Sequence, residues 1–205
     1  MSITRLFLIR HGETDFNKKQ MMQGRGIDAP LNEVGKKQAI CVASALESER
    51  AGQVVASSMM RSIQTAQPLA ISQSLPIQSY EEVDEMDFGD LEGKKSGDIK
   101  DELNRINGEW SSGNVSMRIP GGESPVEVFE RANGRIESLL RGYNSGTLFM
   151  VLHGRLIRIL LSEWLGYGLK NMHQVEHQNG AIYHVQKNDV AFKSIYLNRI
   201  DHLDL

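Results

Sequence analysis

The fold of this chain is indicated most strongly by one stretch, Arg5-Leu6-Phe7-Leu8-Ile9-Arg10-His11-Gly12-Glu13-Thr14. Its first half is a short and almost continuous apolar run, which is typical of a strand buried on both faces. Arg10 and His11 follow the run directly, and Gly12 ends it. The stretch therefore predicts a buried strand that ends in side chains able to do chemistry.

Helices and strands alternate along the rest of the chain. The expected strands cover residues 5–9, 54–56 and 147–152, with a closing pair at 181–185 and 190–197 around a turn at 187–189. The expected helices cover 33–49, 61–74 and 155–165, and Asn32 and Ser124 are suited to cap helix starts. This alternation predicts an α/β fold in three layers, α/β/α, with a mostly parallel central sheet.

Length and composition are those of an ordinary globular domain. The 205 residues suit one compact domain over 1–205, with a polar, lid-like helical excursion at about 92–118. A net charge of −3 argues against nucleic acid as a partner, and no apolar stretch approaches the roughly 20 residues that span a membrane. The single cysteine, Cys41, fits a reducing compartment, so a cytoplasmic location is expected. Homodimer formation stays open.

Polar side chains follow three of the expected strands. Arg10 and His11 follow the first, Arg61 comes shortly after the second, and His153 follows the third. Ligands of open α/β sheets bind at the carboxyl ends of the strands, so these four side chains should converge there. Arginine forks bind phosphate oxygens and a histidine can carry a phosphoryl group, whereas Gly12 lets the backbone approach a ligand. The pattern predicts a pocket for a phosphate dianion.

These residues resemble the signature of the histidine phosphatase superfamily, the phosphoglycerate-mutase-like proteins. The first block is Arg10-His11-Gly12-Glu13-Thr14 with Asn17. Further blocks follow in the family's order: Gln23-Gly24; Leu31-Asn32-Glu33-Val34-Gly35 with Gln38-Ala39; Ser57-Ser58, Arg61 and Gln64-Thr65-Ala66; Glu85-Met86-Asp87-Phe88-Gly89 with Glu92-Gly93; Pro120-Gly121-Gly122-Glu123-Ser124; and His153-Gly154. The resemblance covers the chain from about residue 4 to residue 155.

The resemblance implies a phosphoglycerate-mutase-like fold and a role for each matching residue. His11 would be the nucleophile, and Glu85 the general acid that later activates water as a base. Arg10, Arg61 and His153 would hold the phosphoryl oxygens. The substrate's phosphate would also be lined by Gly12, Thr14, Asn17, Gln23 and Gly24. The family needs neither a metal nor an organic cofactor for hydrolysis, so no cofactor is expected, and the expected partner is a small phosphorylated substrate.

The acid loop favours a phosphatase over a mutase. Glu85 is followed by Met86-Asp87-Phe88-Gly89, which resembles the Phe-Gly-x-x-Glu-Gly pattern of the small phosphatases. Cofactor-dependent mutases of the family carry an Arg-His-Tyr-Gly or Arg-Met-Tyr-Gly sequence there and tend to be longer. The expected activity is hydrolysis of phosphomonoesters of small metabolites. A cofactor-dependent phosphoglycerate mutase stays open as an alternative, and so does a phosphate-binding regulator without catalysis.

Two positions depart from the family pattern. Leu152 stands where the family commonly has Ser or Thr, and Arg155 stands where a second small residue commonly follows His153-Gly154. Neither departure removes a catalytic group. Arg155 either adds positive charge near the pocket mouth or faces solvent, so the substrate contacts at this end stay open.

One further motif points to a different chemistry. His173-Gln174-Val175-Glu176-His177 has the spacing of one class of zinc peptidases, in which both histidines share a helix face. The segment is polar and leads into a closing strand, which argues against a metal site. A cysteine phosphatase is excluded because Glu47 stands six positions after Cys41, where that class needs an arginine.

Overall fold

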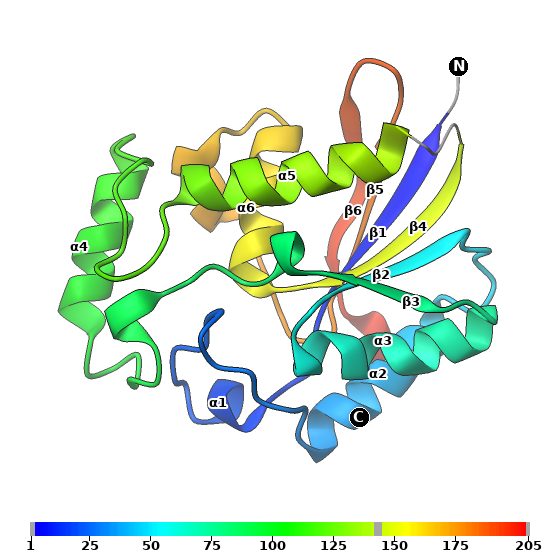
Figure 1. Cartoon of the computed structure of the whole chain (residues 1–205), viewed down its shortest axis with the longest axis horizontal. Helices are drawn as coiled ribbons and strands as arrows, with labels where there is room; N and C mark the ends of the chain where they lie inside the picture. Colours follow the sequence, from blue (N-terminus) through cyan, green and yellow to red (C-terminus); the bar gives the residue numbers. More distant parts are fainter. Residues whose placement is uncertain (1–2, 142–144, 204–205) are drawn as a thin grey trace.

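The chain folds around a central six-stranded sheet (Figure 1). The computed structural model describes residues 3–141 and 145–203. The strand order is β3-β2-β4-β1-β5-β6. Strands β3, β2, β4 and β1 run parallel to one another, and β5 pairs antiparallel with both β1 and β6. The strands are β1 (Thr4–Arg10), β2 (Gln53–Ser57), β3 (Ile77–Tyr80), β4 (Gly146–Leu152), β5 (Ile182–Lys187) and β6 (Phe192–Arg199). The prediction of a mostly parallel sheet is confirmed.

Helices cover both faces of the sheet, which confirms the three layers. Leu6 and Leu8 of β1 pack in the core beneath α5 and α6, whereas Phe7 and Ile9 pack in the core beneath α2 and α3. Alternate residues of a strand point to opposite faces, so one continuous apolar run serves both cores. The covering helices are α2 (Glu33–Ala45), α3 (Met60–Gln73), α5 (Pro125–Arg141) and α6 (Gly154–Trp164).

The predicted caps are present at the helix starts. Asn32 accepts a hydrogen bond from the backbone N–H of Gly35 at 2.9 Å and caps α2. Ser124 and Glu127 exchange the two hydrogen bonds of a capping box at the start of α5. The predicted end of α2 at residue 49 is wrong, because the helix ends at Ala45. The chain turns back there, and Glu49 forms an ion pair with Arg5 of β1 at 2.7 Å.

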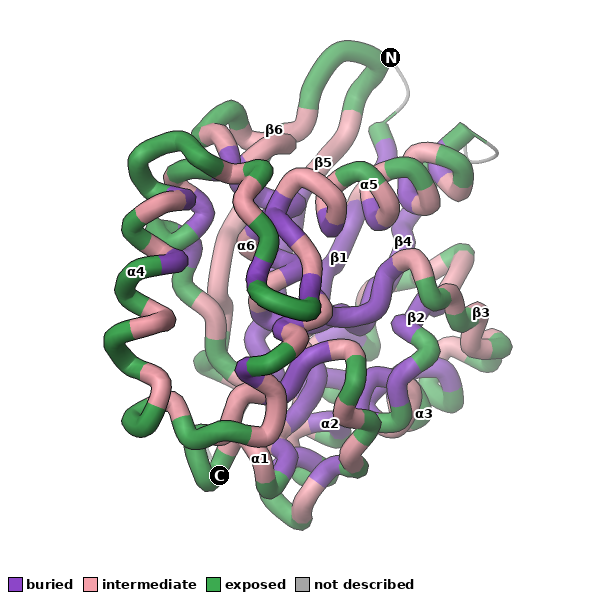
Figure 2. Tube along the Cα trace, turned by 60° about the vertical axis from the view of Figure 1, so that its left-hand side comes forward, coloured by how far each residue is buried: buried purple, intermediate pink, exposed green. Residues whose placement is uncertain are grey.

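The polar excursion contains one helix, α4 (Lys100–Ser111), which stands outside the two helix layers (Figure 1). Figure 2 shows α4 as mostly exposed with isolated buried residues. The buried residues are Ile106 and Trp110, which join the core beneath α5 and α6. Movement of this segment as a lid stays a prediction, and the ends of the predicted domain at 1–2 and 204–205 lie outside the described residues.

Short elements complete the chain: α1 (Asp15–Lys18) and the 3₁₀ helices η1 (Glu81–Val83), η2 (Gly89–Leu91), η3 (Leu169–Gln174) and η4 (Asp201–Leu203). Neither β3 nor α1 was expected from the sequence, because β3 is a polar edge strand and α1 is a single turn. Within residues 3–141 and 145–203, no helix is long and apolar enough to span a membrane.

Candidate active site

His11 lies just beyond the end of β1 and is almost completely buried, with 3% of its surface exposed. Its Nδ1 lies 2.7 Å from the carbonyl oxygen of Gly12, so Nδ1 carries the ring proton and donates it there. Burial lowers the pKa of His11 well below its ordinary value, and the charges of Arg61 and Arg10 lower it further. The imidazole is therefore neutral at physiological pH, and its lone pair is on Nε2.

His153 follows β4 and faces His11, with the two ring centroids 5.1 Å apart. Its Nε2 lies 2.6 Å from Oγ of Ser57, which also accepts the backbone N–H of Met59 at 3.3 Å. The Ser57 hydroxyl can donate to Nε2 or accept from it, and we assign it as the donor because this tautomer leaves Nδ1 of His153 as a donor for a ligand. The ring proton of His153 is then on Nδ1, a buried atom without a hydrogen-bond partner among the described residues. Burial, followed by the charge of Arg61, lowers the pKa of His153 well below its ordinary value.

Two arginines, the buried Arg61 and the half-buried Arg10, flank the histidine pair. Arg61 has 0% exposure and donates to the carbonyl oxygens of Ile27 at 2.8 Å and Gly24 at 3.2 Å. Arg10 donates from Nη1 to the carbonyl oxygen of His177 at 3.4 Å. Burial lowers the pKa of both guanidinium groups, that of Arg61 to about 10, and both stay charged. Within the described residues, the buried Nε of each arginine has no hydrogen-bond partner.

Glu85 lies beside this cluster and caps the start of α6. Its Oε1 accepts the backbone N–H groups of Met86 at 2.9 Å and Leu156 at 3.1 Å, and its Oε2 accepts that of Arg155 at 3.1 Å. The bonds from Arg155 and Leu156 satisfy donors at the helix start, where the N-cap residue His153 makes no side-chain cap. Oε2 accepts only one of the three bonds, so it keeps a lone pair that can carry a proton.

A half-buried ion pair holds the loop that carries Glu85. Arg131 of α5 pairs with Glu123 at 2.7 Å and donates to the backbone carbonyl oxygens of Glu82, Asp84 and Glu85 at 2.9 to 3.0 Å. No sequence pattern pointed to Arg131, which is 46 positions away from Glu85. The carboxylate of Asp84 turns away and accepts from the backbone N–H and hydroxyl of Ser58. Glu85 is thus the acidic residue of this loop that the fold aims at the start of α6.

The other side chains predicted to line the phosphate site, Thr14, Asn17 and Gln23, are hydrogen-bonded to one another or to Asn179. Thr14 and Asn17 make the capping box of α1, and Oγ1 of Thr14 also lies 2.7 Å from Oε1 of Gln23. The amide of Asn179, a residue not singled out in the sequence, donates to the carbonyl oxygens of His11 at 3.0 Å and Gly12 at 3.3 Å. It also donates to Oδ1 of Asn17 at 3.1 Å. Direct contact of these side chains with phosphate stays a prediction.

The two predicted glycines serve close packing within the chain. A Cβ on Gly12 would lie 2.5 Å from the carbonyl oxygen of Gly35 in α2. Contact between the loop and a helix is thus one reason for this glycine, and approach of the backbone to a ligand stays a prediction. A Cβ on Gly24 would lie 2.1 Å from Oε1 of Glu92, whose carboxylate accepts the backbone N–H of Phe88 at 3.0 Å.

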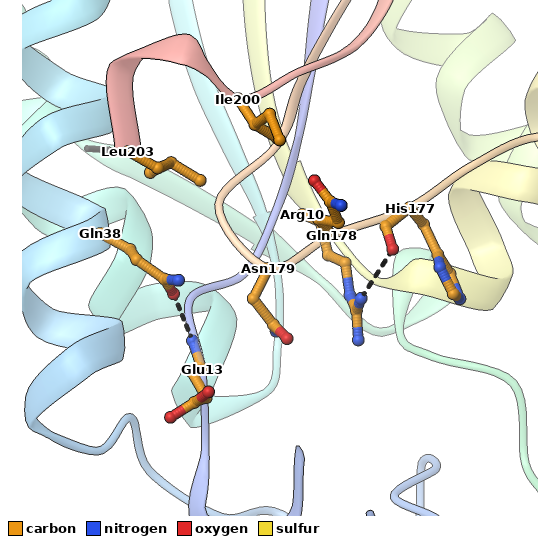
Figure 3. A pocket seen from close by; sticks show the side chains of 8 residues that line it. All are labelled: Arg10, Glu13, Gln38, His177, Gln178, Asn179, Ile200 and Leu203. Atoms are coloured by element: carbon orange, nitrogen blue, oxygen red, sulfur yellow. Dashed lines mark hydrogen bonds between the residues drawn. The ribbon is translucent and has the colours of Figure 1, made fainter. Parts of the chain in front are cut away.

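A hollow of about 460 Å³ lies beside Arg10 (Figure 3). Figure 3 shows the Arg10 guanidinium bonded to the His177 carbonyl, with Asn179 beside it and Glu13 further off, bonded through its backbone N–H to Gln38. The hollow is lined by Arg10, Glu13, Gln38, His177, Gln178, Asn179, Ile200 and Leu203. Arg10 is thus shared between this hollow and the histidine pair.

The zinc-like motif does not form a metal centre. His173 lies in the 3₁₀ helix η3 and His177 in the loop that follows, so the two rings do not share an α-helical face. Burial first, then Arg10 and Arg158, lowers the pKa of His177 to about 3. In the described part of the chain, no group of three or more His, Cys, Asp or Glu side chains could hold a metal ion.

Comparison with known proteins gives consistent results. The model of the histidine phosphatase superfamily (branch 1) matches residues 6–199. The Yersinia enterocolitica protein named "Probable phosphoglycerate mutase GpmB" is 32% identical over 161 residues, covering 78% of this chain and 74% of the relative. The Hydrogenobacter thermophilus protein named "Putative phosphoserine phosphatase 2" is 29% identical, with 97% of both chains covered. The mycobacterial glucosyl-3-phosphoglycerate phosphatase, solved with VO3, superposes with a TM-score of 0.86 at 25% identity, covering 95% of this chain and 98% of that chain.

Proposed function

Because this chain belongs to the histidine phosphatase superfamily, branch 1, we propose that it hydrolyses phosphomonoesters of small metabolites through a phosphohistidine on His11. One observation carries the assignment. Nε of Arg10, Nε of Arg61 and Nδ1 of His153 are buried without partners among the described residues, beside the neutral ring of His11. Buried donors normally find acceptors, and the oxygens of a phosphoryl group supply several at one point.

The geometry supports two chemical steps. In the first, Nε2 of His11 attacks phosphorus, the P–N bond forms, and the P–O bond to the alcohol breaks while Glu85 gives its proton to the departing oxygen. In the second, water attacks the phosphohistidine, Glu85 takes a proton from that water, and the P–N bond breaks to release phosphate. Through both steps Nδ1 of His11 stays bonded to Gly12, and Arg10, Arg61 and His153 balance the charge on the phosphoryl oxygens.

The names of the relatives support small acidic metabolites as substrates. One relative is named for phosphoserine and one solved structure for glucosyl-3-phosphoglycerate. A screen of purified protein against phosphomonoesters of this size tests that part. Cytoplasmic action, inferred from the single cysteine, stays a prediction, as do the absence of nucleic-acid partners and the oligomeric state.

The phosphohistidine is tested by rapid quenching after mixing with ³²P-labelled substrate. The wild type should retain acid-labile label, and His11→Ala should retain none. His173→Ala is the matched control, because it removes an exposed histidine and should keep the label. Label that persists on His11→Ala would overturn the assignment.

A mutase is the second candidate, favoured by the relative named as a phosphoglycerate mutase. A mutase must return the phosphoryl group to a sugar-acid hydroxyl before water reaches it. A coupled assay with 3-phosphoglycerate, with and without 2,3-bisphosphoglycerate, separates the two reactions. Phosphate release should exceed isomerisation, and primer-dependent isomerisation that is much faster than phosphate release would reverse this conclusion.

A further inference from the structure

Arg155 occupies the second position of α6, directly beside the proposed acid. Its backbone N–H donates to Oε2 of Glu85 at 3.1 Å, so its side chain leaves the chain next to the carboxylate. The guanidinium lies over the ring of Trp110, 5.4 Å from the ring centroid. Trp110 belongs to α4 and is itself fixed, because its Nε1 donates to the carbonyl oxygen of Met117 at 2.8 Å. The polar excursion therefore positions Arg155.

The charge of Arg155 makes no ion pair within the described residues, although the Glu85 carboxylate acts on it from nearby and favours its charged form. Its Nη1 is buried and has no hydrogen-bond partner among those residues. Burial lowers the pKa of Arg155 to about 10, and the nearby charge of Arg158 acts in the same direction. Taking part of a guanidinium out of water without an anion in contact is unfavourable, and this makes Arg155 a candidate for binding an anion.

The next arginine of α6 provides a contrast. Arg158 lies one turn further along the helix and donates to the backbone carbonyl oxygens of Met172 and His173. Those carbonyls satisfy its guanidinium and tie α6 to η3. Arg158 therefore has a structural role that Arg155, with its free Nη1 and aromatic support, does not share.

We propose that Arg155 determines specificity by binding a second anionic group of the substrate, on the side of the leaving alcohol. The ester oxygen must lie within about 3 Å of Glu85 to receive its proton, and Arg155 begins at the same carboxylate. The second anion is then only a few bonds from the ester oxygen. A carboxylate or a second phosphate has the two oxygens that a guanidinium fork binds. The proposal rests on the proposed phosphatase function.

Matched substrates test the role of Arg155. 3-Phosphoglycerate and glycerol 3-phosphate differ by a carboxylate in place of a hydroxymethyl group. The wild type should prefer the first in kcat/KM by about 10- to 100-fold, the range expected for a charged hydrogen bond. Arg155→Met should bring the ratio close to one, mainly through KM, since this binding is the same in the ground state and transition state. The ratio of kcat/KM for propane-1,3-diol bisphosphate to that for propyl phosphate shows whether a second phosphate can take the place of the carboxylate.

The Arg155 variants are chosen to preserve the fold. Methionine keeps the backbone N–H to Glu85 and an apolar stem against Trp110, and Arg155→Gln is a second neutral variant should the first fail to fold. Arg158→Met removes the same charge one turn away and should keep the preference. The proposal is overturned if the wild type prefers the doubly anionic substrate in neither substrate pair. It is also overturned if Arg155→Met or Arg155→Gln keeps that preference.

p-Nitrophenyl phosphate, which has no second anion, separates the two hypotheses. Wild type and Arg155→Met should hydrolyse it at similar rates if only specificity has changed. A wild type that hydrolyses neither this ester nor the matched substrates would instead contradict the proposed phosphatase function. The role of Arg155 is judged by the substrate ratios, and the phosphatase function by turnover itself.

Discussion

Acid should destabilise this protein through its buried neutral histidines. In the folded chain the pKa values of His11 and His153 are well below 6.5, and that of His177 is about 3, in each case first because of burial. In the unfolded chain these rings regain ordinary pKa values near 6.5. Between pH 7.5 and 5.5 the unfolded state therefore binds protons that the folded state does not. Stability is complete above about pH 7.5 and falls as the pH decreases.

The size of the effect follows from linkage. One histidine that stays neutral in the folded state loses about 1.4 kcal/mol of stability when the pH falls from 7.5 to 5.5, so three lose about 4 kcal/mol. This is a large part of the roughly 5–15 kcal/mol that stabilises a typical domain. Burial raises the pKa values of Asp84 and Glu92, which act in the opposite direction. The effect of one histidine is therefore tested by comparing a single variant with the wild type, and not by the total pH dependence of the wild type.

The assay is urea unfolding followed by tryptophan fluorescence at pH 7.5 and 5.5. His11→Asn should reduce the loss of stability between the two pH values by about 1.4 kcal/mol, whatever its stability at pH 7.5. His173→Asn is the control, because water surrounds this exposed side chain in both states. An unchanged loss in His11→Asn would show that His11 takes up protons in the folded state. It would refute the lowering of the His11 pKa by burial that keeps this ring neutral in weak acid.

Three further predictions follow from the same contacts. Glu85→Gln should slow the first turnover of an alkyl phosphate by about 10²–10⁴-fold but that of p-nitrophenyl phosphate much less, because nitrophenolate leaves without a proton; equal losses would make Glu85 a positioning residue. Dialysis against a chelator should leave turnover unchanged, and a loss restored by zinc would contradict this. Gly12→Ala should lower the free energy of unfolding by about 1–3 kcal/mol, because its Cβ would lie 2.5 Å from the Gly35 carbonyl oxygen. Exposed Gly134→Ala in α5, where a Cβ meets nothing within 4 Å, should raise it by about 0.5–1 kcal/mol; equal effects would contradict the packing argument.

Local patterns predicted most elements and the main candidate residues. The apolar run before Arg10, the cap at Asn32 and the capping box at Ser124 act over a few residues, so they can be recognised in the sequence. The end of α2 has no such local pattern: the helix ends at Ala45, and Glu49 pairs with Arg5 of β1 instead of continuing it. The edge strand β3 has no apolar alternation and gave no signal.

The sequence by itself determined that Arg10, His11, Arg61 and His153 gather at one edge of the sheet, because the carboxyl ends of parallel strands meet there whatever the side-chain details. Only the tertiary structure decided how these groups are held. Ser57 orients His153 across 96 positions, and Asn179 supports the His11 backbone across 168 positions.

The contacts of Arg131 with the loop of Glu85, and of Arg155 with Trp110, could not be predicted from the sequence either. Arg131 reaches the Glu85 carbonyl across 46 positions, and the position of Arg155 depends on Trp110 in another helix. Such contacts join residues whose spacing follows no helical or strand period, so no local pattern encodes them. They form only when the sheet and its two helix layers bring distant segments together, and they decide which donors remain free for a substrate.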